Sequence, residues 1–185
     1  MVSLGALWIP IVLSAVIVFV ASSILHMVLP YHRSDYKPLP DEEKVMAALR
    51  GAGLKRGLYV FPFCMPKDMK SPAAIEKYKQ GPVGMMTILP SGPPVLPKFL
   101  GMWFVYCVII SFFVALIGHS SVRFGAGYHH VFHVVGLSAF LAYGLANLAN
   151  GIWRGQPWSM VIKETVDGLI YALLTAGTFG WLWPR

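Results

Sequence analysis

The chain has 185 residues, of which 56% are hydrophobic and only 12% are charged, with a formal net charge of +7. Soluble domains are about 45–50% apolar and about 25% charged. This composition excludes a disordered chain, a nucleic-acid-binding domain and a typical cytosolic enzyme. It predicts an all-α membrane protein whose outer surface faces lipid.

Four stretches are long and apolar enough to cross a bilayer, which takes about 20 residues of helix. They are predicted at about residues 4–29, 99–118, 130–151 and 160–183, within a single membrane domain. The first has no basic residue before Arg33, so we expect an uncleaved span and not a signal peptide. The fourth has only about 24 Å of uncharged helix, from Gly168 to Trp183, so it must draw Glu164 and Asp167 toward the lipid.

Four crossings place both termini on one side of the membrane and the long loop, residues 30–98, on the other. Of the 15 Lys and Arg residues, all except Arg123 and Arg185 fall on the loop side. Because short basic loops stay in the cytoplasm, this bias predicts a cytoplasmic loop and external termini.

The loop itself is predicted to hold mixed structure. Acidic residues at 41–43 open one short helix, and Ser71 caps a second that ends at Gly81. Apolar runs at residues 58–65 and 83–89 favour short strands. The lysines are expected to contact anionic headgroups, at about 1 kcal/mol each, although topology alone also explains a basic loop.

Small residues recur every four positions on the third and fourth predicted helices. These two stripes are Ser138, Ala142, Ala146 and Asn150 on the third, and Gly168, Ala172, Ala176 and Gly180 on the fourth. Residues four apart share a helix face, and small ones let backbones approach closely. The stripes therefore predict that these helices pack together within one chain. The alternative is self-association, or packing against other membrane proteins, through the same stripes.

Polar side chains inside the apolar spans form a predicted intramembrane cluster. Its members are His26, Asn147, Asn150, Arg154, Lys163, Asp167, Tyr171 and Thr175, and Thr178 extends the line on the fourth helix. Lys163, one turn before Asp167, is the nearest candidate partner for that carboxylate. One interpretation is a proton or ion path that starts at Asp167. The other is interhelical hydrogen bonding, with Lys163 reaching back to the headgroups.

Four histidines lie on the predicted external side: His119, His129, His130 and His133. His129 and His133 are spaced i, i+4, so they can present two nitrogens to one metal ion. A transition-metal or bis-histidine haem site is one interpretation, and interfacial histidines without a ligand are the other. No further cofactor is predicted. Neither cysteine belongs to a CxxC pair, and no nucleophile–base or paired-carboxylate arrangement indicates an enzyme.

The end of the chain resembles a known kind of protein. The matching segments are Ala142-Tyr143-Gly144, Ile152-Trp153-Arg154-Gly155-Gln156-Pro157-Trp158, Asp167-Gly168 and Gly180-Trp181-Leu182-Trp183. They are similar to the last two spans of small bacterial four-helix membrane proteins of unknown function, whose first loop is shorter than the one here. The resemblance implies a location in the bacterial inner membrane and implies no activity.

The function predicted from these patterns is that of a non-enzymatic accessory or scaffold subunit, which packs against partner membrane proteins. The first alternative is a small oligomeric transporter or proton- or ion-conducting protein that uses Asp167. The second is a haem- or metal-binding subunit that uses the external histidines.

Overall fold

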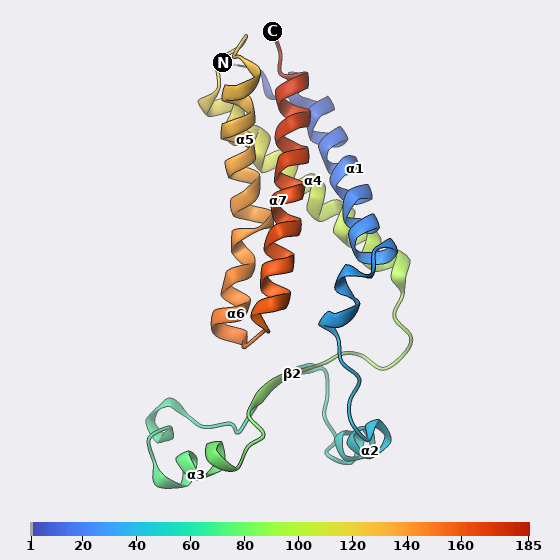
Figure 1. Cartoon of the computed structure of the whole chain (residues 1–185), viewed down its shortest axis with the longest axis vertical. Coiled ribbons are helices and arrows are strands. Elements are labelled where there is room, and N and C mark those ends of the chain that lie inside the picture. The colour runs from blue at the N-terminus through green and yellow to red at the C-terminus, as the bar shows by residue number, and fades with distance from the viewer. Residues whose placement is uncertain (1) are drawn as a thin grey trace. The chain divides into compact units, whose positions relative to one another are not determined.

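The computed structural model describes residues 2–185, which form two compact units. The first comprises residues 2–36 and 95–185, and the second is Lys37–Pro94. The first unit is a helical bundle whose two chain ends lie together at one end (Figure 1).

The bundle is built from four helical stretches, two of which change helix type along their length. The first stretch consists of η1 (Leu4–Leu7), α1 (Trp8–Ser23), the π-helical turn η2 (Ile24–Val28) and the 3-10 helix η3 (Pro30–Asp35). The second is α4 (Leu96–Ser121), and the third consists of α5 (Tyr128–Tyr143), η5 (Leu145–Asn147) and α6 (Leu148–Arg154). The fourth is α7 (Trp158–Leu182). All four predicted helices are therefore present. The third is broken near its middle, which the sequence analysis did not anticipate.

Three of these stretches are long and apolar enough to cross a membrane: Leu4–Val28, Leu96–Ser121 and Tyr128–Arg154. Their large side chains are exposed on the outside of the bundle, as at Val16 and Val20 on α1 and Phe113 on α4. An apolar outer surface of this extent is stable against lipid and not against water. The chain is therefore a polytopic membrane protein. α7 is not among the three, because Lys163, Glu164 and Asp167 and several threonines and glycines make it less apolar than the other stretches.

α7 has more buried residues than any other helix in the described part of the chain, and its closest neighbour is α5. A Cβ atom added at Gly168 would lie 2.3 Å from Cα of Gly144, and one at Gly136 would lie 3.1 Å from Cβ of Ala176. The predicted packing of these two helices within one chain is confirmed. The α7 stripe was predicted correctly, but α5 meets it through Gly136 and Gly144, one residue or more away from the stripe at Ser138, Ala142 and Ala146.

The backbone approach at Gly168 also explains the break in the third helix. Gly144 is the C-cap of α5, so the regular α-helical hydrogen bonds end there. The carbonyl oxygen of Tyr143 therefore needs a donor other than the backbone amide four residues later. The side-chain amide of Asn147 donates to that carbonyl oxygen at 2.9 Å. The same amide lies 3.4 Å from the carbonyl oxygen of Glu164 on α7, so it ties the two helices at the break.

α1 and α4 pack through small polar side chains. Ser14 donates to the hydroxyl of Ser111 at 3.0 Å, and both residues are fully buried. Nearer the η2 end, the indole of Trp103 on α4 donates to the hydroxyl of Ser22 at 2.7 Å. Hydrogen bonds of this kind fix the register of helices where apolar contact alone does not.

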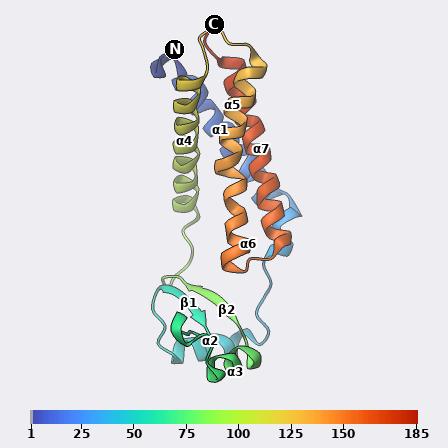
Figure 2. The same ribbon diagram turned by 90° about the vertical axis from the view of Figure 1, so that its left-hand side faces the viewer.

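The second unit contains two short helices and a hairpin, as the loop analysis predicted. Its elements are α2 (Glu42–Gly51), β1 (Gly57–Phe61), the single turn η4 (Pro66–Asp68), α3 (Pro72–Gln80) and β2 (Gly84–Ile88). β1 and β2 are antiparallel neighbours, with Tyr59 opposite Met86 (Figure 2). The hydroxyl of Ser71 accepts a hydrogen bond from the amide of Ala74, which is the predicted N-cap of α3.

Candidate functional site

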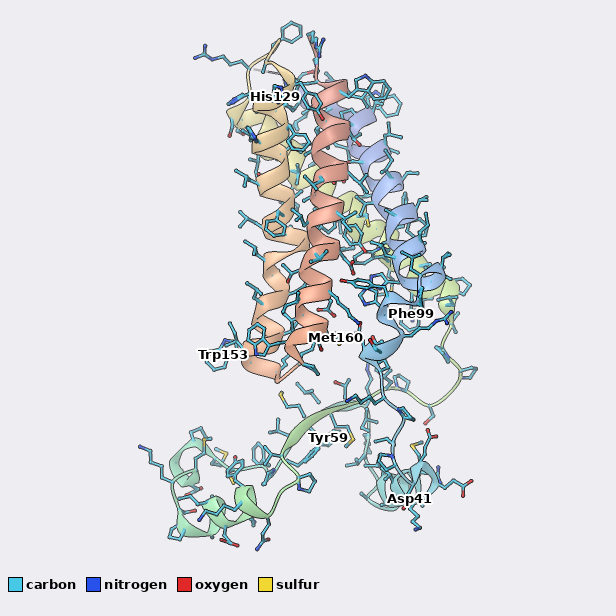
Figure 3. The ribbon with its side chains drawn as sticks, in the orientation of Figure 1. Asp41, Tyr59, Phe99, His129, Trp153 and Met160 are labelled. Atoms are coloured by element: carbon cyan, nitrogen blue, oxygen red, sulfur yellow. The ribbon has the colours of Figure 1, made fainter. Side chains whose placement is uncertain are left out.

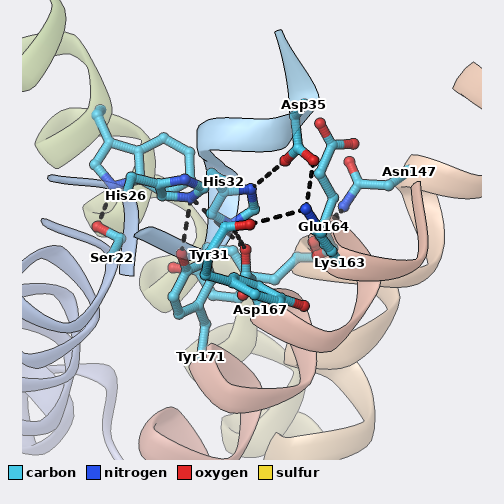
Figure 4. A network of polar contacts seen from close by, with 12 residues as sticks. Ser22, His26, Tyr31, His32, Asp35, Asn147, Lys163, Glu164, Asp167 and Tyr171 are labelled. Atoms are coloured by element: carbon cyan, nitrogen blue, oxygen red, sulfur yellow. Dashed lines mark hydrogen bonds and ion pairs between the residues drawn. The ribbon is translucent and has the colours of Figure 1, made fainter. Parts of the chain in front are cut away.

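Charged and polar side chains of the bundle gather where η2, η3 and the first third of α7 meet. We call these residues the Asp167 cluster: His26, His32, Asp35, Lys163 and Asp167 (Figure 4). The cluster lies toward the end of the bundle opposite the two termini. Figure 3 labels Met160 and Phe99 near that end and His129 at the other.

Local sequence explains why His32 and Asp35 point the same way. The π-helical turn that ends α1 is a feature often found at functional sites. Leu29 is extended, and Pro30 then starts η3 with its fixed φ and no free N–H. In a 3-10 helix, side chains three residues apart eclipse one another. His32 and Asp35 therefore share one face of η3.

Asp167 is the buried centre of the cluster, with a side chain only 2% exposed. Its Oδ2 atom lies 2.7 Å from Nε2 of His32 and 3.8 Å from Nε2 of His26. Its second oxygen, Oδ1, is buried and has no hydrogen-bond partner. Lys163, the partner expected from the sequence, does not pair with Asp167, because η3 brings a different carboxylate to it.

That carboxylate is Asp35. Lys163 Nζ lies 2.6 Å from Asp35 Oδ1, and it also donates to the carbonyl oxygen of Tyr31 at 2.8 Å and to the hydroxyl of Ser34 at 2.9 Å. The hydrogen bond from Lys163 lowers the pKa of Asp35 below its usual value, against the raising effect of burial. Asp35 and Lys163 are therefore a neutral ion pair at ordinary pH.

The ring of His32 is held between two carboxylates. Its Nδ1 lies 2.6 Å from Asp35 Oδ2, and its Nε2 lies 2.7 Å from Asp167 Oδ2. A neutral imidazole carries one proton, so one of its nitrogens would face a carboxylate oxygen with lone pairs on both sides. A doubly protonated, positively charged ring donates to both carboxylates, and a cation bound between Nε2 and Asp167 balances the same charge. Because Lys163 already neutralises Asp35, Asp167 is the carboxylate that this second positive charge serves.

His26 and Tyr171 complete the surroundings of Asp167. The His26 and His32 rings lie 4.2 Å apart between centroids, and the Tyr171 hydroxyl lies 3.4 Å from His26 Nε2. The side chain of His26 is 45% exposed, so this ring forms the outer edge of the cluster. His26 Nε2, His32 Nε2 and an Asp167 carboxylate oxygen all lie within 4.8 Å of one another.

A pocket of about 540 Å³ opens beside the cluster, between the helices of the bundle. His26, Glu164, Asp167 and Tyr171 supply polar groups to its wall. Aromatic and small apolar side chains supply the rest: Phe99, Met102, Trp103, Tyr106, Ala142, Tyr143 and Ala146, with Asn147 at the break in the third helix. A mostly apolar cavity with a few convergent polar groups is the usual form of a small-ligand site.

Glu164 adds a second carboxylate to this pocket. Its Oε1 accepts a hydrogen bond from the side-chain amide of Gln156 at 2.9 Å. Its Oε2 is buried and has no hydrogen-bond partner, like Oδ1 of Asp167. Buried acceptors without partners are rare, because each costs about 1–3 kcal/mol. Two carboxylates of the pocket wall thus each have one buried oxygen without a hydrogen-bond partner among residues 2–185.

No protein-family model, curated protein or solved structure matches this chain. The function of the site is therefore inferred from its geometry.

The remaining residues of the predicted polar cluster have other surroundings. The hydroxyl of Thr175 donates to the Tyr171 carbonyl oxygen of its own helix at 2.8 Å, so the predicted line ends at Tyr171. Asn147 caps the helix break. Arg154 is exposed, and across residues 2–185 the side chains of Asn150 and Arg154 make no hydrogen bond to the cluster. Of the eight predicted members, the structure thus brings His26, Lys163, Asp167 and Tyr171 to the site.

The external histidines lie apart from this site. His129, His130 and His133 are exposed on α5, whereas the ring of His119 contacts the carbonyl oxygen of Val2. Within residues 2–185, the group of three metal-ligating side chains that lies close together is the one at Asp167. The expected metal or haem site at these histidines stays a prediction.

Sequence analysis missed His32 and Asp35, because both follow the first apolar stretch and were assigned to the loop. A signal was present in the His-Arg-Ser-Asp sequence directly after Pro30-Tyr31, which places a histidine and a carboxylate three residues apart. Only the fold of η3 back onto α7 makes that pair part of the bundle.

Proposed function

We propose that this protein is a four-span membrane protein that binds a small cation at Asp167 and passes it between the pocket and the aqueous phase. The observation that carries this proposal is the buried carboxylate of Asp167, whose Oδ2 lies 2.7 Å from His32 Nε2 and whose Oδ1 has no hydrogen-bond partner among residues 2–185. An isolated buried carboxylate costs several kcal/mol. A bound proton or metal ion removes this free-energy cost of the buried charge, and release of the cation restores it. The site can therefore bind a cation reversibly.

The proposed topology includes α7 as the fourth span. Both chain ends lie at one end of the bundle, which an even number of crossings requires (Figure 1). α7 is 25 residues long, enough for about 37 Å of helix. Of its three charged residues, Lys163 and Asp167 contact side chains of η3 and Glu164 accepts a hydrogen bond from Gln156, so each has a polar partner within the chain.

The proposed location follows from charge and from the resemblance of the C-terminal segments. The excess of Lys and Arg in residues 30–98 supports a cytoplasmic position for that loop and external termini. The similarity to small bacterial four-helix proteins supports the bacterial inner membrane. With this orientation the Asp167 cluster lies in the inner leaflet, and a cation enters or leaves on the cytoplasmic side.

The accessory or scaffold role stays a prediction. It depended on small-residue stripes as contact surfaces for partners. Gly168, Ala172 and Ala176 are buried within the chain, so a partner would have to displace α5 to reach them. Contact of the basic loop with anionic headgroups also stays a proposal, supported by the charge of that loop.

Flux measurements in liposomes test the proposed function. Purified protein is reconstituted with an enclosed pH-sensitive dye or an enclosed dye for divalent metal ions, and a membrane potential is imposed. We expect cation flux from the wild-type protein, and flux at the level of empty liposomes from Asp167→Asn, which is isosteric but has no charge. The matched control is Asp41→Asn, because Asp41 is an exposed aspartate of the second unit. Flux that is unchanged in Asp167→Asn would contradict the proposal.

A further inference from the structure

We infer that His26, His32 and Asp167 form a binding site for a divalent first-row transition-metal ion, with Asp35 as the outer carboxylate that orients His32. This inference rests on the proposed function, since it names the cation that the site accepts. Its first support is geometric. One oxygen and two ring nitrogens, from η2, η3 and α7, lie within 4.8 Å of one another.

The distances fit a metal ion after small rotations. Zn²⁺ binds imidazole nitrogen at about 2.0–2.1 Å and carboxylate oxygen at about 2.0–2.2 Å, so neighbouring ligands of a tetrahedral site are about 3.3 Å apart. The separations from Asp167 Oδ2 are 2.7 Å to His32 Nε2 and 3.8 Å to His26 Nε2. These values lie on either side of the required spacing. His26 is half-exposed, so its ring is free to move toward the centre.

The second support is the outer carboxylate. A histidine that binds a metal through one nitrogen almost always donates its other N–H to a carboxylate, a backbone carbonyl or water. His32 Nδ1 has such a partner in Asp35, at 2.6 Å. Lys163 holds Asp35 from the other side at 2.6 Å, which fixes both its position and its negative charge. With its proton on Nδ1, His32 directs the lone pair of Nε2 toward Asp167.

The third support is the pair of unpartnered carboxylate oxygens. Asp167 Oδ1 is buried beside the proposed ion and is available as a further ligand or as an acceptor for a metal-bound water. Glu164, whose Oε2 is also buried without a partner among residues 2–185, belongs to the wall of the same pocket. One divalent ion with two neutral imidazoles and the carboxylates of Asp167 and Glu164 gives zero net charge, which an apolar surrounding favours.

The ligand set selects the class of metal. Two imidazoles and one carboxylate suit Zn²⁺ and its first-row neighbours, whereas Mg²⁺ and Ca²⁺ require oxygen ligands. Three protein ligands leave a coordination position open, as in sites where the metal exchanges water or substrate. That position faces the pocket of about 540 Å³, which is the entry path for the ion.

Zinc binding to the full-length protein in detergent tests the inference. The protein is stripped with a chelator, and Zn²⁺ is titrated in competition with a chromophoric chelator, with Mg²⁺ as the comparison ion. We expect one Zn²⁺ per chain and no competition by Mg²⁺. We expect His26→Ala, which removes one metal-binding side chain, to abolish Zn²⁺ binding. We expect Asp35→Asn to weaken Zn²⁺ binding about 10–100-fold, which is the usual effect of removing the hydrogen-bond partner of a metal ligand.

The control is the double variant His129→Ala and His133→Ala, which removes two exposed histidines at the other end of the bundle. Binding that is unchanged in His26→Ala, or lost in the double control variant, would overturn the inference. Because the side chain of His26 is 45% exposed, we expect its substitution to leave the fold intact, which thermal unfolding without metal checks. X-ray absorption of the zinc-loaded protein gives an independent measure, with two imidazole ligands expected and fewer than two contradicting the assignment.

The two proposals fail separately. If Zn²⁺ does not bind while Asp167→Asn still abolishes proton flux, the metal site is wrong and cation conduction stands. If Zn²⁺ binds through His26 and Asp167 but neither enclosed dye reports flux, conduction is wrong and the metal site stands.

Discussion

Replacement of Gly168 by alanine tests the close approach of α5 and α7. The added Cβ would lie 2.3 Å from Cα of Gly144 and 2.5 Å from the carbonyl carbon of Tyr143. Non-bonded carbon atoms prefer about 3.5–4.0 Å, so the helices must separate locally by more than about 1 Å. The obstructing atoms belong to the backbone and have no rotamer by which to move aside.

The expected magnitude combines two opposing effects. Overpacking of this kind costs about 1–3 kcal/mol. The higher helix propensity of alanine returns about 0.5–1 kcal/mol. We therefore expect Gly168→Ala to lower the free energy of unfolding by about 1–2 kcal/mol, which lowers Tm by about 2–8 °C for a chain of this size.

The matched control is the same substitution at Gly177, on the same helix. There the nearest atom to an added Cβ is the Tyr128 hydroxyl at 3.8 Å, an ordinary contact. Gly177→Ala is expected to raise Tm slightly, because only the propensity gain remains. Thermal unfolding of both variants in one detergent, followed by circular dichroism, measures the difference. Equal stability of the two variants would refute the close packing of α7 against the break in the third helix.

Three further predictions concern single polar groups. Asn147→Ala leaves the carbonyl of Tyr143 without its side-chain donor and is expected to lower the free energy of unfolding by about 1–3 kcal/mol; an unchanged Tm would show that the amide is not needed at the break. Ser71→Ala removes the N-cap of α3 at about 1 kcal/mol, so the amides of that helix should exchange hydrogen about five-fold faster in the full chain, with no change in the bundle. Because the pKa of Asp35 is lowered in the folded protein, its pairing with Lys163 stabilises the fold at pH values above the unfolded-state pKa of about 3.9. This stabilisation is lost as the pH falls through the lower folded-state pKa. The Tm difference between wild type and Asp35→Asn should accordingly be constant from pH 8 to about pH 5 and shrink below about pH 4, and a difference that changes mainly near neutral pH would disagree with this assignment.

Much of the local structure followed from sequence patterns alone. The capping residue Ser71 and the acidic residues before α2 located the two short helices of the second unit, because caps and helix dipoles act over one turn. The apolar runs at residues 58–65 and 83–89 predicted the strands of the hairpin, which the structure has as β1 and β2. Small residues on α7 predicted its packing surface, but the facing surface of α5 contains Gly136 and Gly144, two positions away from the predicted stripe and so on another face of that helix.

Sequence analysis identified only part of the candidate functional site. His26, Lys163, Asp167 and Tyr171 were recognised because ionisable groups in an apolar stretch are conspicuous. The predicted ion pair was wrong, because the one-turn spacing along the helix favoured Lys163 as the nearest partner of Asp167. In the structure η3 inserts between them with His32 and Asp35, and each charge takes a partner from a distant part of the chain.

The sequence by itself determined that lipid surrounds this protein and where its helices run, because hydrophobicity and capping depend on residues close together in the chain. The tertiary structure alone decided which nitrogen faces which carboxylate. Partners 135 and 128 residues apart, as in His32–Asp167 and Asp35–Lys163, are chosen by how the helices pack and where the chain turns back. That choice gives Asp35 the lysine and leaves Asp167 with histidines as its partners.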